Sequence, residues 1–223
     1  MSKTERTPLL FVGHGNPMNA IENNNYTKEW EKIGNKIAPP KAIVCMSAHW
    51  LTTGSFVTST LKPEMIYDFY GFPEKLYHVS YPVRGSPQAA AEIHKTNEQI
   101  EIDNQRGLDH GTWTVLKRMF PKALIPVIQI SIDFSADPKD QFKLMSSLRE
   151  LRRKNILFIG SGNIVHNLVL AASNQRPYDW ALDFEEKSKK LIEKGDIRSL
   201  IEYKNPYVCK VIIRVFCVKN LDY

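Results

Sequence analysis

Residues 7–20 read TPLLFVGHGNPMNA, and His14 stands just after a short apolar run in this stretch. Two further apolar runs, KAIVCMSAHW and NILFIGSGNIVHN, carry His49 and His166 at or just beyond their ends. Such runs are typical of buried strands in α/β proteins, and ligands of open α/β sheets collect at the carboxyl ends of the strands. We therefore expect the three histidines to meet in space. Imidazole is the commonest side chain for binding zinc or iron.

Strand and helix patterns alternate along the rest of the chain. We predict strands at 8–13, 42–48, 55–60, 124–131 and 156–160, with a weaker one at 99–103. We predict helices at 26–37, 87–98, 110–119, 140–153 and 179–194. Pro177 at the start and Gly195 after the end delimit the last of these helices. The alternation favours an α/β fold, with a central, mostly parallel or mixed sheet and helices on both faces.

Length and composition place bounds on the class of protein. A chain of 223 residues with 43% hydrophobic content suits one domain spanning 1–223, with a substantial core. The first residues, MSKTERTP, contain no apolar h-region, and no apolar run approaches the roughly 20 residues that span a bilayer. We therefore expect a cytoplasmic protein without a membrane partner. Three cysteines, Cys45, Cys209 and Cys217, cannot all pair within the chain and are expected to be reduced.

The net charge of +6 does not indicate a nucleic-acid partner. Lysines and arginines are scattered, and the densest cluster, Arg149 to Lys154, is typical of the solvated end of an amphipathic helix. A basic enzyme acting on a small anionic substrate accounts for the charge equally well. We expect such a protein to be a monomer or a small homo-oligomer.

Three other histidines need separate interpretation. His110 follows Asp109 at the start of a predicted helix, where it is either part of a site or a residue of the helix cap. His94 lies in a polar helix pattern and is expected to be solvated, and His78 is expected to be an ordinary loop residue. Between residues 63 and 87, prolines and aromatic residues form a stretch too long for a plain connection, which is typical of a functional lid or wall.

Six ordered motifs resemble those of a known family: GHGNPMNAIENNNYT, SAHW, YDFYGFPEKLYHVSYPVRGSP, LDHGTWTVLKRMFP, PVIQISID and GSGNIVHNL. They are similar to the motifs of LigB-type class III extradiol ring-cleavage dioxygenases, DOPA-dioxygenase branch. The resemblance implies an enzyme with one non-haem divalent metal, Zn²⁺ or Fe²⁺, that opens the ring of a DOPA-like catechol with O₂ as co-substrate. It implies that His14 and His49 are metal ligands, that His166 is a ligand or the acid/base beside the metal, and that His110 contacts substrate or oxygen.

The ending departs from this family pattern. Members are expected to supply a further ligand histidine near the C-terminus, whereas KNPYVCKVIIRVFCVKNLDY contains none. From about residue 205 the chain is therefore expected to be truncated or frameshifted, with weak metal binding as the consequence.

The proposed chemistry suits these residue types. Ring opening needs a metal with open positions, and a neutral histidine beside it, His110 or His166, can move protons near working pH. The aromatic residues of 67–81 are expected to cover the substrate ring, with Asp109 orienting His110 and Ser47 supporting the ligands. Two alternatives stay open: a zinc-dependent hydrolase, and a catalytically weak or silent metal-binding or signalling protein of the same fold.

Overall fold

The computed structural model describes residues 6–166 and 176–202 of the chain. Its central sheet has four parallel strands in the order β1-β8-β2-β6, where β1 is Leu9–Val12, β8 Ile156–Ser161, β2 Ala42–Ser47 and β6 Val127–Gln129. Two small parallel sheets flank it: β3 (Leu51–Thr52) with β7 (Ile132–Asp133), and β4 (Ser55–Thr58) with β5 (Ile100–Asp103). The predicted α/β fold with a mostly parallel sheet is confirmed.

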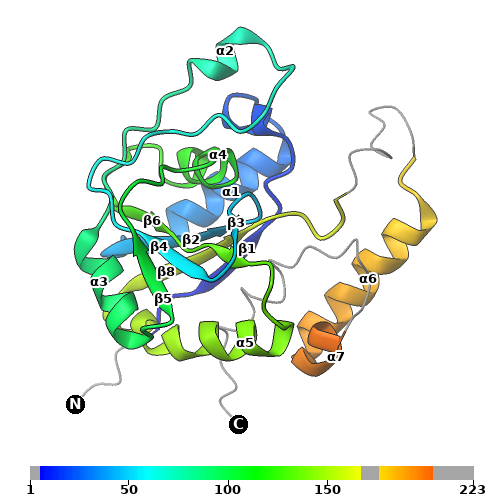
Figure 1. The fold of residues 1–223 in the computed structure, drawn as a ribbon. Helices are drawn as coiled ribbons and strands as arrows, with labels where there is room; N and C mark the ends of the chain where they lie inside the picture. The colour runs from blue at the N-terminus through cyan, green and yellow to red at the C-terminus, as the bar shows by residue number, and fades with distance from the viewer. Residues whose placement is uncertain (1–5, 167–175, 203–223) are drawn as a thin grey trace.

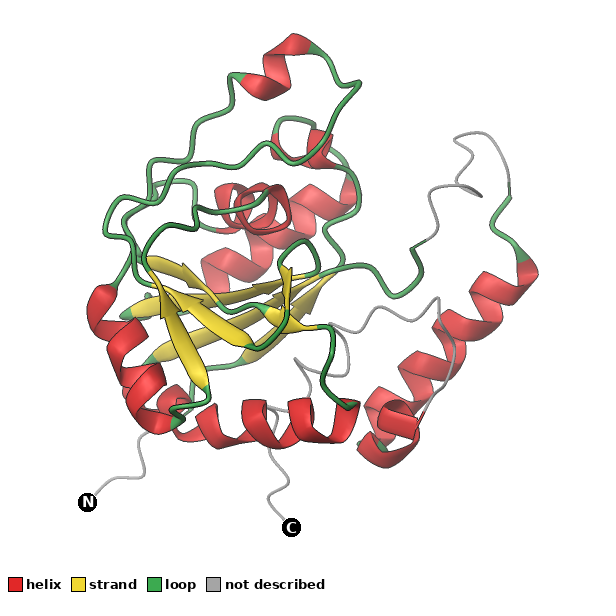
Figure 2. Ribbon diagram, viewed as in Figure 1, coloured by secondary structure: helices red, strands yellow, loops and turns green. Residues whose placement is uncertain are grey.

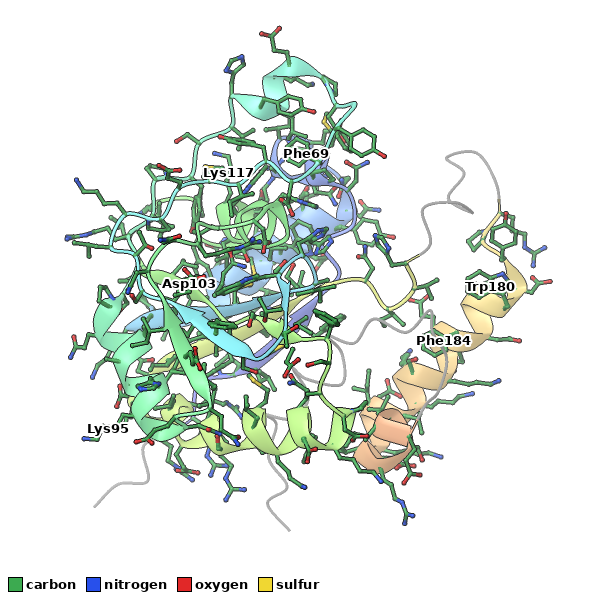
Figure 3. All side chains as sticks on the ribbon, viewed as in Figure 1. Phe69, Lys95, Asp103, Lys117, Trp180 and Phe184 are labelled. Atoms are coloured by element: carbon green, nitrogen blue, oxygen red, sulfur yellow. The ribbon has the colours of Figure 1, made fainter. Side chains whose placement is uncertain are left out.

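Helices cover both faces of the sheet (Figures 1 and 2). They are α1 (Asn25–Lys36), α2 (Glu74–Tyr77), α3 (Pro87–Thr96), α4 (His110–Met119), α5 (Pro138–Ser147), α6 (Asp179–Lys194) and α7 (Ile197–Glu202), with 3-10 helices η1 (Pro17–Ala20) and η2 (Leu148–Lys154). The helix α6 lies to one side of the sheet, and its Trp180 and Phe184 are labelled in Figure 3.

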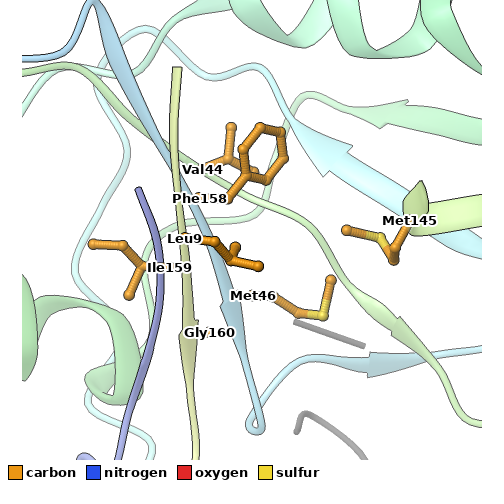
Figure 4. A pocket seen from close by; sticks show the side chains of 7 residues that line it. All are labelled: Leu9, Val44, Met46, Met145, Phe158, Ile159 and Gly160. Atoms are coloured by element: carbon orange, nitrogen blue, oxygen red, sulfur yellow. The ribbon is translucent and has the colours of Figure 1, made fainter. Parts of the chain in front are cut away.

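Alternating side chains of the central strands pack into two hydrophobic cores, one on each face of the sheet. On β2, Val44 packs with α3, α5 and η2, whereas Ile43 packs with α1 and α4. On β8, Phe158 packs in the same core as Val44, and Leu157 packs in the same core as Ile43. Because successive side chains of a strand point to opposite faces, a strand buried on both faces is expected to be almost entirely apolar, as Ala42–Met46 of β2 are. A small apolar cavity of about 10 Å³ lies beside Val44 in the first core (Figure 4).

Local signals in the sequence set most helix boundaries. Asn24 and Thr27 form a capping box at the start of α1, and Asp109 caps α4 by accepting a hydrogen bond from the backbone N–H of Thr112. Gly195 ends α6 in the left-handed conformation, as predicted. Pro177, in contrast, was expected at the start of this helix, but it precedes the cap residue Tyr178 and lies outside the helix.

Several predicted elements differ from those observed. The helix predicted at 140–153 is two elements, because the backbone tightens from α5 into η2 at Leu148. The strand predicted at 124–131 is shortened to β6, since Leu124 is exposed and Pro126 has no N–H to donate to a ladder. The elements β3, β7, η1, α2 and α7 were not predicted; each has six residues or fewer.

Two sequence expectations fall partly or wholly outside the described residues. The altered ending from about residue 205 lies there, as do Cys209 and Cys217. Cys45 is described, and it is a free, buried thiol on β2. Within the described part of the chain, no helix combines the length and apolar character needed to cross a bilayer.

Candidate metal centre

Three adjacent strands, β1, β8 and β2, end in register beneath the site. Val12 of β1 pairs with Ser161 of β8, and Ser161 pairs in turn with Ser47 of β2. The chain continues from β1 to His14 and from β2 to His49, two residues beyond these paired positions. Since parallel strands present their carboxyl ends at one edge, the register brings both imidazoles to the same place.

A third imidazole comes from a helix. His110 is the first residue of α4, and its ring centroid lies 4.0 Å from that of His49 and 5.6 Å from that of His14. Among the residues that the structure describes, His14, His49 and His110 form the group that could hold a metal ion, with ligand atoms all within 4.8 Å of one another. His14 and His110 are buried, and His49 is partly buried.

Hydrogen bonds determine which nitrogen of His14 faces this group. The Ser161 hydroxyl donates to the carbonyl oxygen of Gly111, so its oxygen accepts from Nδ1–H of His14 at 2.9 Å. The Nε2 lone pair of His14 is thereby left free, and it lies 3.2 Å from Nε2 of His49.

A carboxylate, Asp68, faces the other two rings. Its Oδ1 accepts hydrogen bonds from both Nδ1–H and the backbone N–H of His110, each at 2.9 Å, and its Oδ2 lies 3.4 Å from Nδ1 of His49. Burial raises the pKa of Asp68, but the hydrogen bonds from His110 and the nearby imidazoles outweigh burial and lower the pKa to about 2. The ionised carboxylate only accepts hydrogen bonds, so Nε2 of both imidazoles is left to face the group.

The electrostatics favour the neutral forms of His14 and His49. Burial, followed by the neighbouring imidazoles of His49, His110 and His166, lowers the pKa of His14 to about 3, and the carboxylate of Asp68 only partly opposes this. Burial is also the main cause of a lowered pKa for His49, followed by the charge of His110. A neutral imidazole with a free Nε2 lone pair is the form that binds a metal.

The geometry of these nitrogens fits a cation. Two nitrogens each about 2.0–2.1 Å from one metal, at bond angles between a right angle and the tetrahedral value, lie roughly 2.9–3.4 Å apart. The 3.2 Å between Nε2 of His14 and Nε2 of His49 falls within this range. Without a cation, two lone pairs would face each other at that distance.

Close packing at Gly111 brings α4 against the site. A Cβ at this position would lie 2.5 Å from Oγ of Ser47, 2.9 Å from Cδ2 of His49 and 3.2 Å from Nδ1 of His14. Only glycine allows the first turn of α4 to approach the imidazoles this closely.

Aromatic residues of the 63–87 loop form a wall beside His110. Phe69 meets the His110 ring edge-on, with centroids 5.5 Å apart, and Tyr67, Tyr77 and Trp113 pack around Phe69. Figure 3 shows Phe69 on the side of the molecule that carries α2 and α4. A groove of about 1090 Å³ lies next to the His14 segment. It is lined by Gly13 and Gly15, by asparagine, aromatic and aliphatic side chains of the β1, η1 and α1 regions and of residues 163–165, and by Glu29 and Glu185.

Comparison with known proteins identifies the family. The family described as "Catalytic LigB subunit of aromatic ring-opening dioxygenase" matches residues 7–211. The chain belongs to the LigB family. A "4,5-DOPA dioxygenase extradiol" of Escherichia coli K12 is 44% identical over 194 residues, covering 85% of this chain and 71% of the relative. A protein of the same name from Beta vulgaris is 35% identical over 211 residues, covering 87% and 76%.

A solved structure shares the LigB fold of this chain. The crystal structure of an uncharacterized protein from Escherichia coli K12 superposes with a TM-score of 0.79 at 33% identity, covering 96% of this chain and 89% of that one. The ring-cleaving dioxygenase activity of this LigB protein is supported by the family and the named relatives. The resemblance drawn from the sequence motifs is confirmed.

The predicted site residues are placed as follows. The structure brings His14 and His49 together, and it adds His110, which the sequence had suggested as a catalytic residue, to the same group. His166, predicted as a ligand or acid/base, is exposed and outside the group, although its charge lowers the pKa of His14 and His49. The individual roles of His14, His49, His110 and His166 are still predictions.

The expectations for Asp109 and His94 need correction, and the expectation for Ser47 is confirmed. Asp109 was expected to orient His110, but its carboxylate accepts from Thr112 and Gln129 and faces Arg106, because it is committed to capping α4. His94 was expected to be solvated, but it is partly buried and hydrogen-bonded to the carbonyl of Ile100. Ser47 does support the site, since its Oγ accepts from the backbone N–H of His49. Of the two residues that bind the imidazoles and were not predicted, Ser161 could be inferred from strand register and Asp68 could not.

Proposed function

We propose that the chain opens the aromatic ring of a DOPA-like catechol with O₂, using one divalent metal held by Nε2 of His14 and Nε2 of His49. The single observation that carries this proposal is the pair of neutral imidazoles facing each other at 3.2 Å in a member of a ring-opening family. The names of the relatives support the substrate class.

The metal is proposed to be Fe(II). When bound, it supplies Lewis acidity and open positions for the two catechol oxygens and for O₂. Zinc has no redox chemistry of its own, which favours iron for a reaction that consumes O₂.

Side chains of the protein are proposed to supply the proton transfer and the contacts with the substrate ring. His110 is proposed to take a proton from a catechol hydroxyl through its free Nε2, because Asp68 holds Nδ1–H and stabilises the imidazolium that forms. Phe69 and Tyr67 are proposed to contact the ring and exclude water on that side. The groove beside His14 is large enough for a small aromatic molecule, and its aromatic and aliphatic lining residues suit the ring of one.

Oxygen uptake tests this proposal. Metal-free protein, reconstituted without air with Fe(II) or with Zn²⁺, should consume one O₂ per catechol only in the iron form. His49→Ala should bind metal poorly and show no uptake. Hydrolysis without oxygen uptake would instead indicate a zinc-dependent hydrolase, and a reconstituted protein that holds iron without turning over any catechol would indicate a silent member of the fold.

The role of His110 is tested by a separate variant. His110→Ala should keep metal content close to that of the wild type and lower turnover by about 10²-fold or more, the usual scale for a general acid or base. Loss of the metal would assign His110 as a third ligand instead.

A further inference from the structure

One carboxylate serves two imidazoles with different proposed tasks. Asp68 contacts His110 through Oδ1 and His49 through Oδ2, and both contacts are made at Nδ1. Histidine exists in two neutral tautomers, and the partner of one ring nitrogen decides which nitrogen carries the proton. The geometry assigns Asp68 as a positioning residue. Its hydrogen bond fixes the Nδ1–H tautomer of His110, and its negative charge 3.4 Å from Nδ1 of His49 favours the same tautomer there, so that both Nε2 lone pairs are directed at the metal centre. This inference rests on the proposed function for the identity of the site.

The two oxygens of Asp68 are not equivalent. Oδ1 accepts two hydrogen bonds from His110, one of them from its backbone N–H at the start of α4, so this oxygen is anchored. Oδ2 faces only the ring of His49 among these contacts. The asymmetry determines what happens when the carboxylate is replaced by an amide.

An Asp68→Asn substitution keeps the shape of the side chain and changes one end of it. The amide oxygen should occupy the Oδ1 position, because two N–H donors of His110 point there. The amide NH₂ then faces Nδ1 of His49, and two N–H donors cannot face each other favourably. His49 should therefore move its proton to Nε2, where it meets the Nε2 lone pair of His14 at 3.2 Å.

The substitution thus replaces a metal site by a hydrogen bond. The Nε2–H of His49 would donate to His14 and occupy the direction that the metal needs. Folding need not suffer, since every group keeps a partner. Metal affinity should fall by roughly 10–100-fold, the usual effect of losing a residue that orients a metal-ligating histidine.

The position of Asp68 in the chain also links the metal centre to the aromatic wall. The residue stands between Tyr67 and Phe69 in the loop that forms the aromatic wall. A substrate ring that shifts these aromatics would also shift the carboxylate that holds His49 and His110. The wall therefore reaches the metal centre through Asp68 as well as through the contact between the Phe69 and His110 rings.

The test begins with the metal-free protein. Nitrogen-15 spectra of its histidines should show the Nδ1–H form for His49 and His110 in the wild type, and the Nε2–H form for His49 in Asp68→Asn. Competition with a chelator should then show the roughly 10–100-fold loss of Zn²⁺ affinity in that variant, while denaturation should still show a cooperatively folded protein. Asp140→Asn, which removes an exposed charge on α5, is the matched control and should leave both readouts unchanged.

The outcomes separate this inference from the proposed function. If His49→Ala loses Zn²⁺ while Asp68→Asn binds it as the wild type does, the role of Asp68 is wrong and the metal site stands. If His49→Ala also binds Zn²⁺ normally, the proposed metal site itself is wrong. A wild-type spectrum with His49 in the Nε2–H form overturns the inference without any variant.

Discussion

Replacing Gly111 by alanine tests how tightly the first turn of α4 packs on the site. The added Cβ falls short of an ordinary contact of about 3.4 Å by roughly 0.9 Å at Oγ of Ser47, 0.5 Å at His49 and 0.2 Å at His14. In an unhindered helix, the same change would stabilise the protein by roughly 0.4–1 kcal/mol. Overpacking of this kind costs about 1–3 kcal/mol, so the strain should win and the variant should be less stable.

The functional loss in Gly111→Ala should exceed the loss of stability. Ser47 Oγ cannot move away freely, because it accepts the hydrogen bond from the backbone N–H of His49. Displacing the His49 imidazole by about 0.5 Å reaches the limit of what a metal or catalytic site tolerates. We expect Zn²⁺ affinity to fall at least about 10-fold and turnover by about 10²-fold.

Chemical denaturation and Zn²⁺ competition measure the two effects in Gly111→Ala. Gly195→Ala is the control, because its left-handed backbone is strained by any side chain while its Cβ would meet nothing within 4 Å. The control should lose stability and keep normal metal affinity. A Gly111→Ala protein that is more stable than the wild type and binds Zn²⁺ equally well would refute the packing argument.

Two further predictions concern His14. Ser161→Ala removes the acceptor of its Nδ1–H and the donor to the carbonyl of Gly111, so metal affinity should fall by roughly 10-fold in a chelator competition, whereas Ser146→Ala on α5 should have no effect. The pKa of His14 is lowered to about 3 in the folded state, so between pH 6.5 and 3 the unfolded chain binds a proton that the folded one does not. Unfolding of the metal-free protein should therefore become easier as pH falls through this window, by up to about 1.4 kcal/mol per pH unit from this group. In His14→Gln the dependence should be weaker by that amount, and an unchanged slope would show that His14 titrates normally.

The sequence predicts the sheet well because its strands are short, mostly apolar runs, of which β2 and β8 are buried on both faces. The runs that carry β1, β2 and β8 are recognisable without any tertiary information, and α4 and α6 have the boundaries expected from their caps. The elements that escaped prediction are too short to show a periodicity, such as β3 with two residues. Their pairing is set by tertiary contacts, which local sequence does not encode.

The site was predictable to the extent that strand ends define it. His14 and His49 follow from the sheet, whereas His110 reaches them only because α4 packs closely through Gly111. Asp68 could not be recognised in advance, since a single acidic residue among aromatic ones in a long loop carries no periodic signal. Asp109, adjacent to His110 in sequence, was the obvious orienting group, yet helix capping already occupies it.

The in-register ends of β1, β8 and β2 also determine where this chain can change length. Inserting one residue within any of these strands would exchange its two faces and carry the following side chain away from its partners. The connections between His14, His49 and His110 span 35 and 61 positions in the sequence, but these lengths are not what holds the imidazoles together. Natural variation in loop length can therefore remodel the surroundings of the site while the spacing from strand end to histidine stays fixed at two residues.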